Sequence, residues 1–260
     1  MKYSVNALTL KWIAIVTMFI DHAGYVCYKW LGWSETYLLM RHIGRIAFPI
    51  FVLLLLEGFR YTRNRWAYLR NLFIFALISE VSFDLALTGW DVRMNMQNIF
   101  FTLCLGLLNI MLLDGLREWG KAKRPPVRYL AYPCMIFSVV ALLAAAEIIR
   151  VDYKAWGVLI VVLIYAGEEC VPRLTAERMT PQLARNVGAV IGIALWMALY
   201  DSANGWLNEC YGIFAVIPIL LYDGTRGQYR LSKWFFYGFY PVHLLILYLC
   251  RDTLFRWLLT

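Results

Sequence analysis

Residues 7–28 read ALTLKWIAIVTMFIDHAGYVCY, an apolar stretch long enough to cross the hydrocarbon core of a membrane as a helix. The second half of this stretch contains Asp21 and His22. Ionisable side chains are costly at membrane depth, and those found there usually serve a function. The pair is therefore the first candidate for a functional site in this chain.

The next apolar stretch, residues 38–59, reads LLMRHIGRIAFPIFVLLLLEGF and carries Arg41, His42, Arg45 and Glu57. Lipid alone would not tolerate so many ionisable groups in two successive helices. The two stretches together therefore indicate an active membrane protein.

The composition excludes an ordinary soluble domain. Of the 260 residues, 62% are hydrophobic and 16% are charged, and the mean hydropathy is +0.60, whereas soluble domains carry about 25% charged residues. No repeat, low-complexity tract or linker divides the chain. The sequence predicts an all-α polytopic transmembrane helical bundle, forming a single domain over residues 1–260. About nine spans are expected, near residues 7–28, 38–58, 67–88, 96–114, 129–149, 156–171, 183–201, 209–222 and 233–250.

Lysine and arginine crowd alternate connections between these spans, and such residues mark the cytoplasmic side of a membrane. The pattern predicts a multi-pass protein of the cytoplasmic or inner membrane, surrounded by lipid, with its N-terminus in the cytoplasm and its C-terminus outside. The net charge of +8 is then an orientation signal, so no nucleic-acid partner is predicted. The six cysteines have neither a C-x-x-C spacing nor a neighbouring histidine, so no metal site is predicted.

Several ionisable side chains should lie at one depth in the outer half of the membrane. His22 follows Lys11 by eleven residues, which a helical rise of about 1.5 Å per residue converts to roughly 16 Å. The second span enters from outside, so Arg41 and Arg45, one turn apart, should reach the depth of His22. Pro49 cannot donate to the carbonyl of Arg45, so a bend is expected one turn beyond the arginines.

Later spans add polar groups that could support this cluster. Glu80 and Asp84 share one face of the third span, where Asp84 could meet Arg45 or Arg41, and Asn98 opens the fourth span. Tyr240 and His243 should lie near mid-depth in the last span. The residues counted as substrate-binding or supporting are His42, Glu80, Asp84, Asn98, Tyr240 and His243.

Plainer interpretations of these residues stay open. Arg45 with Asp84 or Glu80 could be an ion pair that only locks helices together, since charges within membranes usually pair. His243 could be a buried core histidine. Arg60, Arg63 and Arg65 could be an orientation signal rather than a phosphate-binding group.

Five segments carry a distinctive pattern: LKWIAIVTMFIDHAGY (10–25), RHIGRIAFPIFVLLLLEGFRYTRNR (41–65), YLRNLFIFALISEVSFDLAL (68–87), NIFFTLCLGLL (98–108) and FYGFYPVHLLILYL (236–249). In these segments the chain resembles the TraX family, which is named for a conjugative-plasmid protein associated with N-terminal acetylation of pilin. The resemblance covers about the first 110 residues and the last span, and it is weak between them.

TraX-like proteins in turn resemble bacterial membrane acyltransferases that move acyl groups from cytoplasmic acyl-CoA to acceptors outside. In those enzymes a basic residue precedes a catalytic histidine by eleven positions, and Lys11 and His22 reproduce that spacing, with lysine in place of the usual arginine. A later FPLFFFLSGF-like segment is similar to residues 48–59, and a late Y-x-x-H is similar to Tyr240 and His243. The resemblance implies an acetyltransferase.

The roles that follow are expectations. Arg60, Arg63 and Arg65 would bind the phosphates of acetyl-CoA, the expected cosubstrate, with Lys11 and Glu57 near the mouth of its site. His22 would be the general base, oriented by Asp21 or another carboxylate. Arg41 or Arg45 would stabilise the oxyanion. The acceptor outside could be a pilin-like or other exported peptide, a glycan or a lipid.

Two other functions use the same kinds of residue. A proton-coupled membrane transporter or flippase would also need buried acids, arginines and histidines, although inverted repeats are not visible in the sequence. A non-catalytic membrane assembly factor is the third hypothesis.

Overall fold

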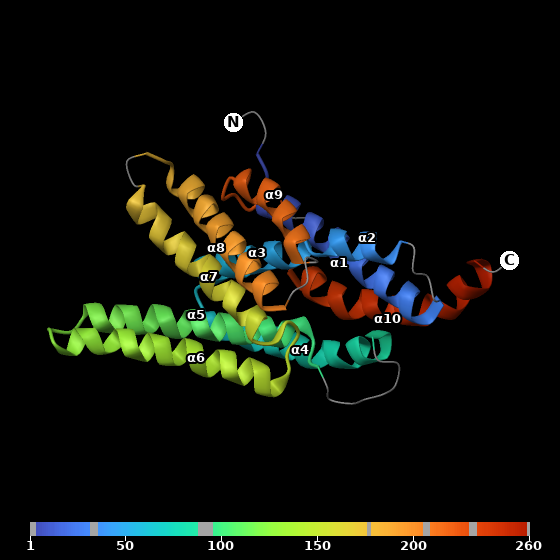
Figure 1. The fold of residues 1–260 in the computed structure, drawn as a ribbon, viewed down its shortest axis with the longest axis horizontal. Helices are drawn as coiled ribbons and strands as arrows, with labels where there is room; N and C mark the ends of the chain where they lie inside the picture. The colour runs from blue at the N-terminus through green and yellow to red at the C-terminus, as the bar shows by residue number, and fades with distance from the viewer. Residues whose placement is uncertain are drawn as a thin grey trace.

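The computed structural model describes residues 4–31, 36–87, 96–175, 178–204, 209–228 and 233–258, and within them it contains helices and no strand (Figure 1). In chain order the helices are α1 (Ala7–Leu31), α2 (Tyr37–Gly44), α3 (Ala47–Tyr61), α4 (Arg65–Leu87), α5 (Ile99–Lys121), η1 (Val127–Leu130), α6 (Ala131–Ile149), α7 (Lys154–Leu174), α8 (Pro181–Asn204), η2 (Glu209–Ala215), α9 (Val216–Leu220) and α10 (Lys233–Leu258). The predicted all-α architecture is confirmed.

Six segments are long and apolar enough to cross a membrane: Ala7–Tyr28, Tyr37–Tyr61, Ile99–Lys121, Val127–Ile149, Lys154–Leu174 and Pro181–Asn204. Each of the nine predicted ranges falls largely on helix, but α4 and α10 are outside this set of six, and Glu209–Leu220 is short. The all-α multi-pass class holds, while the count of nine spans and the orientation of the termini stay predictions.

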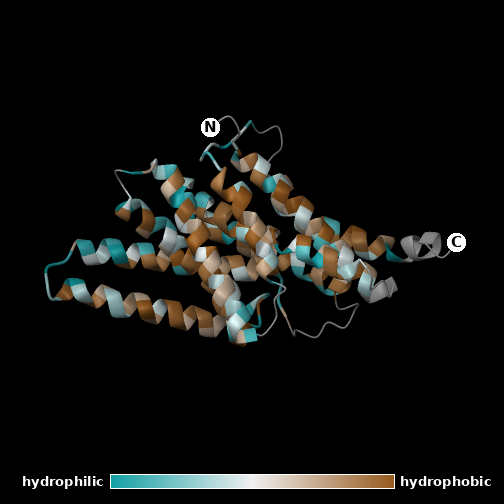
Figure 2. Cartoon of the chain, turned by 45° about the horizontal axis from the view of Figure 1, so that its top comes forward, coloured by the Kyte–Doolittle hydropathy of each residue, from teal (hydrophilic) through white to brown (hydrophobic). Residues whose placement is uncertain are grey.

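Helix α1 has one face buried in the bundle and one face exposed on the outside, as expected for an apolar helix in a membrane. Leu10, Ala14 and Met18, spaced by four residues, are buried in the bundle. Trp12 and Val16 lie on the outer face and are 40% and 52% exposed, as expected for side chains that contact lipid. Figure 2 shows hydrophobic residues along most helices and hydrophilic residues at the tip of the α5–α6 hairpin.

Helices α7 and α8 pack at very short range. A Cβ atom added to Gly188 would lie 2.2 Å from the carbonyl oxygen of Gly167, and one added to Gly192 would lie 2.6 Å from that of Leu163. Small residues at four-residue spacing allow helix backbones in membranes to approach this closely. The four-residue spacing of Gly188 and Gly192 in the sequence predicts a close helix contact at these positions, and the structure confirms it.

The second apolar stretch is not one continuous helix. α2 ends at Gly44 and α3 begins at Ala47, so the interruption falls at Arg45 and Ile46. Pro49 explains it, because its ring nitrogen cannot donate to the carbonyl of Arg45. A bend was expected one turn beyond the arginines; the structure puts it at the second arginine itself.

The connection between α6 and α7 is short and conformationally unusual. Arg150, Tyr153 and Lys154 have positive φ angles of 59°, 58° and 48°, a region that non-glycine residues rarely adopt. Backbone hydrogen bonds tie the connection to Gln97, two residues before α5, from Gln97 N to Arg150 O (2.9 Å) and from Asp152 N to Gln97 O (2.8 Å). These bonds set the positions of Asp152 and Tyr153 at the bundle interior.

Candidate functional site

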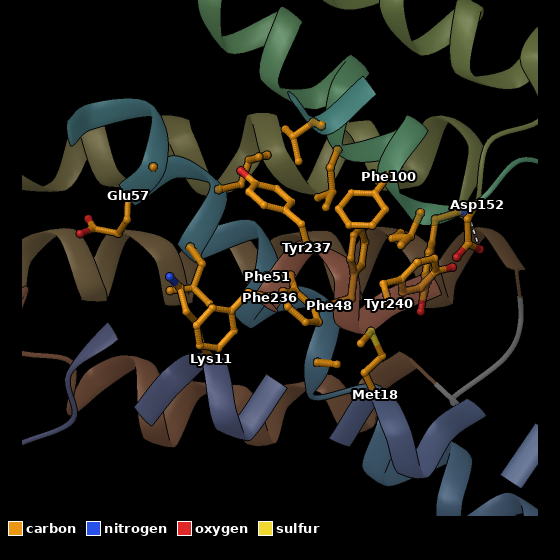
Figure 3. A pocket seen from close by; sticks show the side chains of 18 of the residues that line it. Lys11, Met18, Phe48, Phe51, Glu57, Phe100, Asp152, Phe236, Tyr237 and Tyr240 are labelled. Atoms are coloured by element: carbon orange, nitrogen blue, oxygen red, sulfur yellow. Dashed lines mark hydrogen bonds between the residues drawn. The ribbon is translucent and has the colours of Figure 1, made fainter. Parts of the chain in front are cut away.

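A cavity of about 1340 Å³ runs through the bundle and has a polar group of residues at each end. We call one the Lys11 end, lined by Lys11, Glu57, Asn64, Tyr222 and Arg226. We call the other the His22 end, lined by Asp21, His22, Arg41, Arg45, Asp152, Tyr153 and Glu209. Between Lys11 and Glu57 on one side and Asp152 on the other, Figure 3 shows the rings of Phe48, Phe51, Phe100, Tyr237 and Tyr240.

His22 meets a second histidine at the His22 end. Its Nδ1 lies 2.7 Å from Nε2 of His243, and the two rings are nearly parallel with 5.0 Å between centroids. The Nδ1 atom of His243 lies 2.7 Å from the carbonyl oxygen of Phe239. The edge of Tyr240 packs against the His22 ring at 5.8 Å. The group that contacts Nδ1 of His22 and could orient its ring is thus the imidazole of His243, and not the expected carboxylate.

Asp21 instead joins the two arginines. One of its oxygens, Oδ2, accepts from Nη1 of Arg41 at 2.6 Å, and the other, Oδ1, accepts from Nη2 of Arg45 at 3.0 Å. The side chains of Asp21 and Arg45 are each 10% exposed. A buried carboxylate shared by two guanidinium groups fixes the break between α2 and α3 against α1.

Arg45 has two further partners, and the sequence did not indicate either of them. Its Nη1 donates to Oε1 of Glu209 at 2.6 Å and to the hydroxyl of Tyr153 at 2.7 Å. The Tyr153 ring stacks on Phe48 with 4.6 Å between centroids. The acids paired with Arg45 are therefore Asp21 and Glu209, in place of the expected Asp84 or Glu80. The one available signal for Glu209 was an acid at the start of an apolar segment.

Gly44 is required for this arrangement. A Cβ atom added there would lie 2.1 Å from Oδ1 of Asp21, well inside van der Waals contact. The last turn of α2 can therefore approach the carboxylate only because position 44 has no side chain.

Asp152 adds a third acid to the His22 end. Its Oδ1 accepts from the backbone N–H of Tyr153 at 3.0 Å, and its backbone carbonyl accepts from the hydroxyl of Thr102 at 2.6 Å. Burial raises the pKa of its carboxyl group to about 6, against the opposing effect of Arg45 and Arg41. Asp152 can therefore change its charge in mildly acidic solution.

At the Lys11 end, Glu57 and Arg60 belong to an internal ion network. Glu57 accepts from Arg60 Nη1 at 3.1 Å and from the hydroxyl of Tyr222 at 2.8 Å. The other terminal nitrogen of Arg60 donates to Glu168 on α7 at 2.6 Å. Arg60 thus ties α3 to α7, a role that its place in a basic cluster did not reveal.

Arg63 and Arg65, the other arginines of the predicted phosphate-binding group, lie outside the cavity lining. Arg65 pairs with Asp114 at 2.6 Å and lies over the Phe59 ring at 4.0 Å. Arg63 is exposed. Of the described residues that line the cavity, the basic ones at this end are Lys11 and Arg226, so Arg60, Arg63 and Arg65 do not line it. In the sequence, Arg226 belongs to a basic connection before the last predicted span and therefore indicates only the orientation of the chain.

The other supporting candidates divide between the site and the scaffold. Tyr240 lines the cavity. Asn98 donates to Glu80 and to the carbonyl of Ala76 and accepts from the backbone of Phe100, so it caps α5 and joins it to α4. His42 stacks on Tyr211 at 3.7 Å, outside the cavity lining. Glu80 and Asp84 do not line the cavity either.

Comparisons with known proteins agree with the resemblance. A family model described as "TraX protein" matches residues 6–251. The probable fimbrial assembly protein FimC, serogroup H1, of Dichelobacter nodosus is 29% identical over 267 aligned positions, which cover 93% of this chain and 94% of that protein. No solved structure matches the chain. Because the family model matches nearly the whole chain, both ends of the cavity included, this chain belongs to the TraX protein family.

Proposed function

We propose that this protein is an integral membrane acetyltransferase that takes an acetyl group from cytoplasmic acetyl-CoA and transfers it to an acceptor on the outer side. The observation that carries the proposal is the continuous cavity that joins Lys11 and Arg226 at one end to His22 at the other. An enzyme whose two substrates lie on opposite sides of a membrane needs such a passage.

The cavity suits the donor in shape and charge. The distance along α1 from Lys11 to His22 is roughly 16 Å, which the slender pantetheine arm of CoA can span. The arm would pass between the rings of Phe48, Phe100 and Tyr237. Lys11 and Arg226 would attract the phosphates at the cytoplasmic mouth, and Asn64 would add hydrogen bonds.

The chemistry requires a base and an oxyanion stabiliser. His22 would remove a proton as the acceptor's nitrogen or oxygen attacks the thioester carbonyl. The bond from the acetyl carbon to sulfur then breaks, and the CoA thiolate recovers the proton from His22. Arg41 and Arg45 both line the cavity. Arg41 is the better oxyanion stabiliser because it has one described acidic partner, whereas Arg45 is occupied by Asp21, Glu209 and Tyr153.

An exported pilin-like subunit is the acceptor that we favour. The curated relative is named as a probable fimbrial assembly protein. An N-terminal ammonium has an ordinary pKa of about 8, so a usable fraction loses its first proton to solvent near neutral pH. The neutral amine can then attack, and His22 takes the second proton from the nitrogen.

Proteoliposomes would test this proposal directly. Vesicles carrying the purified protein, loaded with radiolabelled acetyl-CoA, would be given a peptide with the N-terminal sequence of a mature pilin on the outside. We expect label on the peptide and one CoA thiol released per acetyl group transferred. His22→Ala should lower the rate about 10² to 10⁴-fold. Arg178→Ala, an exposed change outside the cavity lining, is the matched control.

The same assay separates the alternatives. A transporter or flippase would release no CoA thiol, whatever crossed the membrane. An assembly factor without catalysis would transfer no label. An active His22→Ala variant would show that His22 is not the base.

A further inference from the structure

We propose that His243 is the positioning residue for His22, holding its ring with a proton on Nδ1 and a bare Nε2 for the reaction. The effect on rate rests on the proposed function, whereas the protonation pattern does not. The two histidines are separated by 221 positions in the chain, and α1 and α10 bring them together.

The direction of the hydrogen bonds follows from the last acceptor in the chain. The carbonyl oxygen of Phe239 can only accept, so the Nδ1 of His243 that contacts it must carry a proton. A neutral imidazole has one N–H, so Nε2 of His243 is bare and must accept from Nδ1 of His22. The proton of His22 is then on Nδ1, and its Nε2 is free.

Burial favours the neutral form of His243, on which this argument depends. His243 is 3% exposed and packs against Phe239 with 4.9 Å between ring centroids. Its two ring nitrogens contact His22 and the carbonyl of Phe239, so a charged imidazolium in that position would lose its hydration without an acid as hydrogen-bond partner. A doubly protonated ring is therefore disfavoured at His243.

The position of the pair relative to the cavity assigns the roles. His22 lines the cavity, and His243 is not among the described residues that do. With Nδ1 of His22 directed at His243, the nitrogen left for a substrate is Nε2. His243 therefore acts through His22 and does not touch the reacting atoms.

An imidazole takes this role because the nearest acid is already occupied. Both oxygens of Asp21 accept from arginines, Oδ1 from Arg45 and Oδ2 from Arg41. When Nε2 of His22 takes a proton, the Nδ1 proton stays on His22 and continues to be donated to Nε2 of His243 along the 2.7 Å contact. The ring of His22 therefore keeps its orientation in both protonation states, and His243 stays neutral.

Nitrogen NMR can read the protonation pattern directly. The chain has three histidines, so protein labelled with 15N at histidine gives at most six ring signals, and protonated and bare nitrogens have well separated shifts. His42→Ala removes one set, and His22→Ala removes another. We expect wild-type His22 to show a protonated Nδ1 and a bare Nε2.

Two substitutions at position 243 separate positioning from packing. His243→Gln retains a carbonyl oxygen that can accept from Nδ1 of His22, whereas His243→Phe retains a flat ring that cannot. We expect the Gln variant to keep the Nδ1–H form and most of the transfer rate. The Phe variant should shift His22 to the Nε2–H form and lose about 10²-fold or more in kcat at an unchanged KM for acetyl-CoA. Val242→Ala, at an exposed neighbouring position, is the control.

The outcomes distinguish the two proposals. An Nε2–H form in the wild-type protein, or equal rates for the Gln and Phe variants, would overturn the role of His243. The Nδ1–H form in a protein that transfers no acetyl group would support the pairing and overturn the proposed function.

Discussion

Arg45 and Asp21 form the ion pair that fastens the break between α2 and α3 to α1, with 3.0 Å between Nη2 and Oδ1. Glu209 holds the other side of the same guanidinium at 2.6 Å. One arginine thus joins three separate parts of the chain at the His22 end of the cavity.

Arg45→Ala should destabilise the protein strongly. The change leaves Glu209 without its cation, and removing one partner of a buried pair costs about 3 to 5 kcal/mol. Thermal unfolding of the purified protein in detergent measures the loss. Lys121→Ala, which breaks the solvent-exposed pair with Glu118, should leave the unfolding temperature nearly unchanged. Equal effects of the two changes would show that the Arg45 network contributes no more than a surface pair.

Gly44→Ala should disturb the site without removing a functional group. The new methyl group would lie 2.1 Å from the Asp21 carboxylate, so the carboxylate must move and its bonds to Arg41 and Arg45 must lengthen. We expect a loss of at least tenfold in transfer rate and a lower Tm. Gly115→Ala is the matched change, because its methyl group meets nothing within 4 Å in the middle of α5. The Gly115→Ala change should be neutral or should stabilise the protein by about 0.5 to 1 kcal/mol. A Gly44→Ala protein with the same Tm and transfer rate as Gly115→Ala would contradict the close contact between Gly44 and Asp21.

Lys11→Ala and Arg226→Ala should weaken the binding of CoA. Both side chains line the mouth at the Lys11 end, where attraction to phosphates is screened by ions. Calorimetric titration with CoA at low and high salt should show about tenfold weaker binding for each variant at low salt and a smaller difference at high salt. Arg63→Ala tests the hypothesis drawn from the basic cluster: if it weakens binding more than the other two, the phosphates bind outside the cavity.

Asp152 should make stability depend on pH in a defined window. The folded pKa of about 6 lies above the unfolded value of about 3.9. Between these values the folded protein binds more protons than the unfolded chain, so stability falls as pH rises from about 4 to 6. Asp152→Asn removes this effect, and its Tm relative to wild type should rise across that window and level off above it. A difference in Tm that is constant from pH 4 to 7 would contradict the raised pKa.

The fold was largely predictable because hydropathy acts locally. Each apolar run of the sequence becomes helix, and the spacing of Lys11 and His22 along one helix sets their separation before any tertiary contact is known. Pro49 likewise indicated the interruption between α2 and α3, since it removes a particular hydrogen bond.

The ion-pair partners within the site were harder to predict, because the charge of a residue does not determine which oppositely charged residue it contacts. Arg60 looked like a phosphate ligand from its arginine neighbours, but Glu168, 108 positions away, occupies it. Glu209 and Tyr153 reach Arg45 from 164 and 108 positions away. Such pairings depend on how helices pack, which a hydropathy pattern does not contain.

The rings between the two ends of the cavity also affect how easily ions and protons could leak across the membrane. A water-filled passage across a membrane would let protons and ions flow down their gradients, and each elementary charge that leaks through 100 mV dissipates about 2.3 kcal/mol. Phe48, Phe100 and Tyr237 form an apolar section, and narrow apolar sections exclude water and ions. The same rings that line the proposed path of the pantetheine arm would therefore serve as the insulator that keeps the membrane charged.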